Sequence, residues 1–326
     1  MTKNGGMKLV TFRPRGSTEE KAGALLDGGW ILEFDRAIPA CRGTSVLDLL
    51  RHADTLLLLA HDVVSHAVSS RPEALVHEST VELLAPLPRP LSVRDGHAFR
   101  QHVEAVRRSR GLGVISEFDS FPVFYFTNHL TVVGPGDVHV GRRRLEKLDY
   151  ELECFCVIGR RVVNPTLEEA DEAIAGYGVM NDLSARALQA EEMKLGLGPA
   201  KGKDFATAIG PWLVTRDEVA SRLERTPRGN VLHARMTAHV GDELLSEGNV
   251  DQMHWTFAQI VQRAADGVML EPGEVIGSGS VGTGCLLELN ASGTTKERWL
   301  KPGDVVTLSI EGLGSLTNRI VEDPSR

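Results

Sequence analysis

The chain has 326 residues, of which 42% are hydrophobic, and its formal net charge is −8. This acidic balance gives no support for nucleic-acid binding. The longest apolar run, residues 55–60, is far shorter than the roughly 20 residues that cross a membrane. Because the first residues also lack an apolar export segment, we expect a cytoplasmic protein that binds neither nucleic acid nor a membrane.

The first 88 residues are predicted to form a small α/β domain. Ser45 is a candidate cap for a helix that enters the leucine stretch. Three prolines within residues 86–90 can continue neither a helix nor a central strand. We therefore predict domains at residues 1–88 and 89–326. Strands in the first domain are expected at residues 7–12, 30–34 and 81–85.

The second domain is predicted to be α+β and rich in strands. Thr166 and Glu169 have the spacing of a capping box at the start of a helix. The glycine-rich loop at residues 195–203 lacks the ending of a phosphate-binding loop, so nucleotide binding is not expected. Strands are expected at residues 122–126, 130–133, 148–158, 177–180, 211–214, 231–240, 274–279, 285–289 and 305–310, and helices at residues 103–108 and 253–263, after Thr166, and up to about Met193.

The cysteines are Cys41, Cys154, Cys156 and Cys285, and they form no CxxC pair. A zinc site is therefore not indicated. We expect small buried thiols in a chain that is kept reduced.

Residues 148–154, with the sequence Leu-Asp-Tyr-Glu-Leu-Glu-Cys, are the most informative stretch. Side chains alternate between the two faces of a strand, so the apolar residues point into packing and the acidic ones point the other way. Glu151 and Glu153 would lie roughly 7 Å apart, at about 3.3 Å of rise per residue. Such carboxylates repel each other unless a cation or a shared proton compensates, so the stretch predicts a divalent ion. Asp149 is expected to pair with a cation such as Arg186 instead.

Two further acidic residues, Asp95 and Asp182, lie near the ends of regular elements beside glycine or turn residues. With Glu151 and Glu153 they would form a set of carboxylates without a thiol or imidazole. Such a set suits a hard cation such as Mg²⁺, Ca²⁺ or Mn²⁺. Spacing alone leaves an alternative open, because Asp182 could instead cap the helix that follows it.

Several short motifs in the second domain occur in one order and together resemble the fumarylacetoacetate hydrolase family. They are Asp95-x₆-His102, residues 148–153, Met180-Asn-Asp-Leu-Ser-Ala-Arg186-x₂-Gln189, Gly198-Pro-x₂-Gly-Lys203-x-Phe-x-Thr207 and Gly277-Ser-Gly-Ser280. Each is weak alone, but their common order at compatible spacing is a specific signal. The resemblance covers roughly residues 90–320, and the small first domain fits the bacterial two-domain members loosely.

The resemblance implies a mixed β-sandwich roll with flanking helices, generally assembled as a homodimer. It implies a Mg²⁺-dependent hydrolase that cleaves a carbon–carbon bond in a β-diketone or acylpyruvate-type acid, a fumarylacetoacetase-type enzyme of aromatic or related catabolism. Its partner would be a small diketo or oxo acid. A decarboxylase, hydratase or tautomerase of a 2-oxo acid is the alternative, and a non-catalytic metal-binding scaffold is a third interpretation.

The resemblance also implies roles for individual residues. His102 would be the general base that activates water, Glu288 would orient it, and Lys203 would stabilise charge on oxygen. Taken singly, His102 could be a satisfied surface or core histidine, and Lys203 could be a solvent-exposed loop residue. The implied metal ligands are Asp95, Glu151, Glu153 and Asp182, with Thr207 nearby; the implied substrate contacts are Tyr125, Arg186, Gln189, Ser280 and His97.

Some positions depart from the family pattern. His97 stands where the named hydrolase has a tyrosine, and Met193 falls near another substrate-contacting tyrosine. The carboxylate-binding arginine is not fixed between Arg107, Arg108 and Arg110. We therefore expect a substrate other than fumarylacetoacetate, or one held differently. The pairing of His102 with Glu288 favours hydrolysis, because family members that work without water attack often lack the pair.

Overall fold

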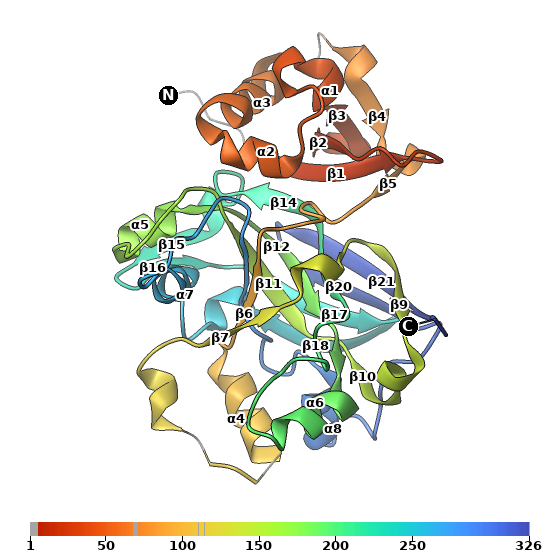
Figure 1. Cartoon of the computed structure of the whole chain (residues 1–326), viewed down its shortest axis with the longest axis vertical. Helices are drawn as coiled ribbons and strands as arrows, with labels where there is room; N and C mark the ends of the chain where they lie inside the picture. Colours follow the sequence, from red (N-terminus) through yellow and green to blue (C-terminus); the bar gives the residue numbers. More distant parts are fainter. Residues whose placement is uncertain (1–5, 68–70, 110, 114, 326) are drawn as a thin grey trace.

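The computed structural model describes residues 6–67, 71–109, 111–113 and 115–325. Two sheets form the body of the molecule in these residues, and neither closes on itself (Figure 1). In spatial order the larger sheet contains β4 (Leu75–His77), β3 (Trp30–Glu33), β2 (Lys21–Leu25), β1 (Lys8–Pro14), β14 (Thr207–Thr215), β12 (Ile174–Asp182), β11 (Leu152–Ile158), β19 (Val275–Gly277), β6 (Val93–Gly96) and β7 (Phe124–Thr127), with β5 (Val81–Leu83) on β1 and β8 (Val132–Val133) on β14.

The smaller sheet packs against one face of the larger. It contains β18 (Glu243–Asn249), β17 (Arg235–Val240), β20 (Val305–Ile310), β21 (Gly314–Glu322) and β9 (Gly136–Val140), and two short pairs are formed by β10 (Leu148–Asp149) with β13 (Ser184–Ala185) and by β15 (Leu223–Thr226) with β16 (Gly229–Leu232). The helices are α1 (Phe34–Ala37), α2 (Val46–Arg51), α3 (Leu58–Asp62), α4 (Arg100–Ser109), α5 (Leu167–Glu172), α6 (Arg186–Met193), α7 (Phe257–Ala264) and α8 (Leu286–Ala291). The strand-rich α+β fold expected from the sequence is confirmed.

The central strands of the larger sheet are buried on both faces. Cys154 and Cys156 of β11 belong to the core that lies between the two sheets. Phe155 and Val157, on the opposite face of the same strand, pack into a second core that includes Leu49 of α2. This alternation follows from the period of a strand and explains why β11 is almost entirely apolar.

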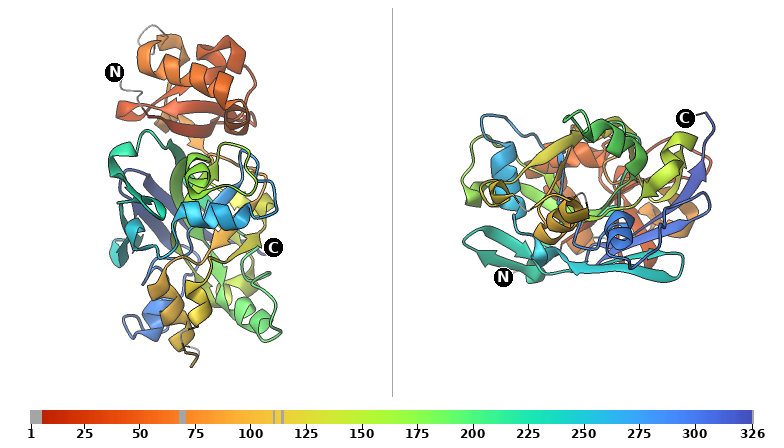
Figure 2. Two further views of the ribbon diagram at one scale, coloured as in Figure 1. Left: turned by 90° about the vertical axis from the view of Figure 1, so that its left-hand side faces the viewer. Right: turned by 90° about the horizontal axis from the view of Figure 1, so that it is seen from below.

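The N-terminal strands continue the larger sheet. β1 pairs antiparallel with β14, with Lys8 opposite Val214 and Leu9 opposite Leu213. The second core likewise spans both parts of the chain, since Phe34 of α1 and Leu213 both belong to it. A domain boundary between residues 88 and 89 stays a prediction. The larger sheet and the second core both contain residues from either side of it. Figure 2 shows the N-terminal helices at one end of the molecule and α4, α6 and α8 at the other.

The predicted helix caps are confirmed where the capping residue lies next to its helix in the sequence. Ser45 and Thr166 each accept a hydrogen bond from the third residue of the helix that follows and complete capping boxes. The predicted strand at residues 285–289 is wrong, because these residues begin α8. Its first free N–H groups are satisfied by Asp149, more than a hundred residues away, so no local cap signals this helix.

Two predicted strands are interrupted. The stretch 148–158 breaks at Tyr150 and Glu151, because β10 pairs with β13 whereas β11 pairs with β12. The stretch 231–240 is likewise divided between β16 and β17. Among the described residues, no helix combines the length and the apolar character needed to cross a membrane.

Candidate active site

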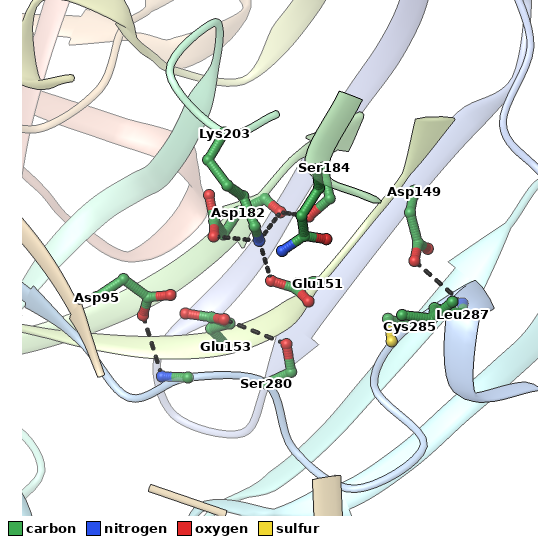
Figure 3. A network of polar contacts seen from close by, with 12 residues as sticks. Asp95, Asp149, Glu151, Glu153, Asp182, Ser184, Lys203, Ser280, Cys285 and Leu287 are labelled. Carbon is green, nitrogen blue, oxygen red and sulfur yellow. Dashed lines mark hydrogen bonds and ion pairs between the residues drawn. The ribbon is translucent and has the colours of Figure 1, made fainter. Parts of the chain in front are cut away.

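Acidic side chains from nearby strands of the larger sheet meet close to the ends of those strands (Figure 3). Asp95 comes from β6, Glu153 from β11 and Asp182 from the last position of β12, while Glu151 lies in the link between β10 and β11. One oxygen of each residue lies within 4.8 Å of the others. All are at most 5% exposed, so the sheet order brings together the carboxylates that the sequence predicts.

The cluster carries repulsion that a cation would relieve. Burial and the charge of Asp182 raise the pKa of Asp95 to about 8. Burial and the nearby charge of Asp95 also raise the pKa of Glu153. Among the described atoms, Glu153 Oε2 and Asp182 Oδ1 are buried without a hydrogen-bond partner. Oxygen ligands with unused lone pairs in a repulsive cluster fit a hard divalent cation. Asp182 does not cap α6, whose N-cap position is Ala185.

Lys203 supplies positive charge beside the cluster. Its side chain is almost fully buried, and its ammonium contacts carboxylate oxygens of Glu151 and Asp182. Although burial alone would lower the pKa of Lys203, these carboxylates raise it, so the ammonium stays charged. The glycine-rich loop makes this position possible, since a Cβ at Gly202 would lie only 2.8 Å from the Cβ of Gln189.

Each nitrogen of the Arg186 guanidinium donates a hydrogen bond to another side chain of the protein. Its Nε donates to Asp149 Oδ2 at 2.8 Å, which confirms the predicted pair. The two other nitrogens donate to Glu151 Oε1 at 2.6 Å and to Gln189 Oε1 at 3.0 Å. Although burial would raise the pKa of Glu151, the charges of Arg186 and Lys203 hold it well below its ordinary value. Arg186 therefore keeps Glu151 ionised and in place.

His102 and Glu288 form a buried pair, with His102 Nδ1 hydrogen-bonded to Glu288 Oε1. Their helices, α4 and α8, lie against each other at the end of the molecule away from α1 (Figure 1). The other oxygen of Glu288 accepts the N–H of Thr283 at 3.0 Å. Thr283 has a φ of 66°, a left-handed conformation that is uncommon for a β-branched residue.

Sequence reasoning missed the residues that support this pair. Ser246 Oγ donates to the carbonyl of Thr283 at 2.6 Å and shares a second hydrogen bond of 2.7 Å with Tyr150. Asp149 accepts the N–H groups of Leu286 and Leu287 and so fixes the start of the helix that carries Glu288. No spacing in the sequence relates these residues, because each contact joins distant segments.

A cavity of about 540 Å³ adjoins the carboxylate cluster and His102. The predicted site residues that line it are Asp95, His97, His102, Tyr125, Glu151, Glu153, Arg186, Gln189, Lys203 and Ser280, and Arg107 and Met193 line it too. Asp182, Thr207 and Glu288 do not line the cavity. Two lining residues hold carboxylates of the cluster: Tyr125 donates to Asp182 at 2.5 Å, and Ser280 donates to Glu153 at 3.3 Å. Arg108 is exposed and Arg110 lies outside the described residues.

The fold and this acidic site at neighbouring strand ends place the chain in a class of strand-rich enzymes with flanking helices. Residues 92–321 match the family model described as fumarylacetoacetate (FAA) hydrolase C-terminal. The chain therefore belongs to the fumarylacetoacetate hydrolase family, as the sequence motifs predict.

Relatives in this family have different activities in their names. The chain is 28% identical to the mitochondrial oxaloacetate tautomerase fahd2 of Xenopus laevis over 97% of this chain and 90% of that one. It is 26% identical to the oxaloacetate tautomerase YisK of Bacillus subtilis over 85% of this chain and 86% of that one. A solved maleylpyruvate hydrolase from Sphingobium sp. SYK-6, in complex with manganese(II) ion and pyruvate, has a TM-score of 0.68 and 18% identity, covering 97% of this chain and 99% of that chain.

Proposed function

We propose that the chain is a divalent-metal-dependent hydrolase that cleaves a carbon–carbon bond in a β-diketone or acylpyruvate-type acid. The observation that carries this proposal is the His102–Glu288 pair, because His102 lines the same cavity as three carboxylates of the cluster. A base held by a carboxylate beside a metal site suits the activation of water.

Asp95, Glu151, Glu153 and Asp182 would hold the metal, and we propose Mg²⁺ as the native ion. When bound, the ion would supply Lewis-acid polarisation of a substrate oxygen. Support for a divalent metal comes from the unpartnered buried oxygens of this cluster and from the manganese complex of the Sphingobium relative. Thr207, close to Asp182 in the sheet, is proposed to support the metal region.

The chain's own residues would divide the remaining work. Because Nδ1 of His102 faces Glu288, Nε2 is the ring nitrogen that would accept a proton from water. The ammonium of Lys203 would stabilise negative charge that develops on a substrate oxygen, in a buried site where such an interaction is strong. Tyr125, Gln189, Ser280 and His97 are proposed to position the substrate, whereas Arg186 is proposed to act by holding Glu151.

A tautomerase of a 2-oxo acid is the second candidate. The observation that favours it is the pair of relatives named oxaloacetate tautomerase, which align with most of the chain. The same buried base could move a proton between carbon and oxygen without breaking a carbon–carbon bond. Because both candidates would use the same metal and the same base, only the products of the reaction distinguish them.

Incubation of the metal-loaded chain with acylpyruvates or with oxaloacetate in H₂¹⁸O tests the proposal. A hydrolase produces two fragments from an acylpyruvate and places one ¹⁸O in the new carboxylate. Intact oxaloacetate with faster keto–enol exchange, and no cleavage of acylpyruvates, would support the tautomerase and refute the hydrolase. His102→Gln should abolish turnover while metal binding persists; His129→Gln, outside the cavity lining, is the matched control. A cytoplasmic homodimer remains part of the proposal.

A further inference from the structure

The cavity continues beyond the carboxylate cluster into a wall of apolar side chains. Val103 and Val106 come from α4, Phe118 from the turn at Ser116–Asp119, and Phe121 and Val123 from the segment that leads into β7. We call these five residues the apolar wall. Val103 and Phe118 are buried, whereas Phe121 is 40% and Val123 47% exposed. The wall therefore presents apolar surface toward the cavity that the folded chain leaves only partly covered.

The size of the cavity exceeds what a small oxo acid needs. Cavities of roughly 300–1,000 Å³ hold ligands of drug size, and this one measures about 540 Å³. A four-carbon acid bound at the carboxylate cluster and His102 would fill only the polar end. The substrate must therefore extend along the apolar wall if it is to displace the remaining water.

Charge near the wall does not favour a second carboxylate. Among the residues that line this part of the cavity, Arg107 and Glu117 contribute one charge of each sign. Two further guanidiniums stack on rings of the wall, Arg100 on Phe118 and Arg263 on Phe121. Each of them is paired with a carboxylate of its own, Asp119 and Asp266 respectively. The Nε of Arg107 is already engaged, donating to the carbonyl of Gly113 at 2.5 Å. A carboxylate here would gain from Arg107 and lose against Glu117, whereas an apolar group would gain from burial against the wall.

We propose that the substrate carries a bulky apolar group, aromatic or branched alkyl, at the end away from its oxo-acid, and that this group packs on the apolar wall. The inference deepens the proposed function, since it takes the oxo-acid end to bind at the carboxylate cluster. It excludes substrates whose far end is a second carboxylate, and it names Phe121 and Val123 as residues that set specificity.

Binding of 2-oxo acids that lack a cleavable bond between two carbonyls tests this inference. Calorimetry on the metal-loaded full chain would compare pyruvate, 2-oxohexanoate, phenylpyruvate and the diacid 2-oxoadipate. Each methylene that becomes buried should tighten binding by about fourfold. Phenylpyruvate should bind at least about tenfold tighter than pyruvate, and 2-oxoadipate should bind more weakly than 2-oxohexanoate. A diacid that binds tighter than 2-oxohexanoate, or equal affinity for all four acids, would overturn the inference.

Matched variants assign the effect to the wall. Phe121→Ala should weaken phenylpyruvate about fivefold or more and leave pyruvate unchanged. Leu130→Ala is the control, because Leu130 is also exposed but does not line the cavity. An equal loss for both acids in Phe121→Ala would count against the wall.

These measurements do not depend on turnover. If acylpyruvates are not cleaved but the apolar preference in binding persists, the proposed hydrolase fails and the inference stands. If acylpyruvates are cleaved and diacids are preferred, the inference fails and the proposed function stands.

Discussion

Replacing Glu288 with glutamine tests the proposed catalytic pair with little change in shape. The amide can still accept the N–H of Thr283, which lies 3.0 Å from the present carboxylate. It loses the negative charge beside His102 Nδ1, and hydrogen bonds to charged groups contribute about 1.5–3 kcal/mol. At about 1.36 kcal/mol per tenfold in rate, this loss should lower kcat by about 10–150-fold. The contribution of a general base, typically about 10²–10⁴-fold, sets the upper limit of the effect.

The assay would measure steady-state kcat and KM on the cleaved acid, with metal affinity measured by calorimetry. Glu288 is not one of the clustered carboxylates, so metal affinity should change by less than about threefold. Glu146→Gln is the matched control, because Glu146 is an exposed acid away from the cavity lining. A kcat within about threefold of the unmodified chain would refute the role of the pair. Loss of metal binding would refute the separation of base and metal site.

Three further outcomes follow from the same geometry. Asp182→Asn should weaken divalent-metal binding by at least about tenfold in calorimetry, because it removes one of the clustered charges. Without metal, the raised pKa of Asp95 means that the folded chain keeps a proton between pH 3.8 and about 8 that the unfolded chain has released. The free energy of unfolding should therefore fall as pH rises through this window. Added Mg²⁺ should reverse this trend in denaturant titrations. Arg186→Met should lower the free energy of unfolding by about 3–5 kcal/mol, because buried Asp149 would lose the cation that it binds and Glu151 would keep only Lys203. A loss below about 1 kcal/mol would contradict this.

The acidic residues of the site can be predicted from the sequence, whereas most of the residues that support them cannot. Glu151 and Glu153 can be predicted to share a ligand because the period of a strand is local. The apolar neighbours of Glu288 predict a strand there, and the N–H groups that begin α8 are bound by Asp149, far away in the chain, so no local signal indicates the helix. The contacts of Ser246 and Thr283 depend on how distant strands and loops meet, which no spacing in the sequence encodes.

The fold class follows from the turn and strand signals, but the joining of the N-terminal strands to the larger sheet does not. Prolines at residues 86–90 indicate a boundary in the chain, and they say nothing about pairing across it. The apolar wall was likewise not predicted, because Phe118 and Val123 come from irregular segments where periodicity gives no direction.

The pairing of β1 with β14 has a practical consequence for anyone who shortens the chain. A fragment that starts at residue 89 would uncover the backbone of β14 around Leu213 and Val214. It would also strip the cover from Phe155, on the face of β11 that packs into the second core. An uncovered strand edge next to bare apolar surface is a template for aggregation. The N-terminal segment thus covers an edge of the larger sheet and part of its second core, and it should be retained in any expressed fragment.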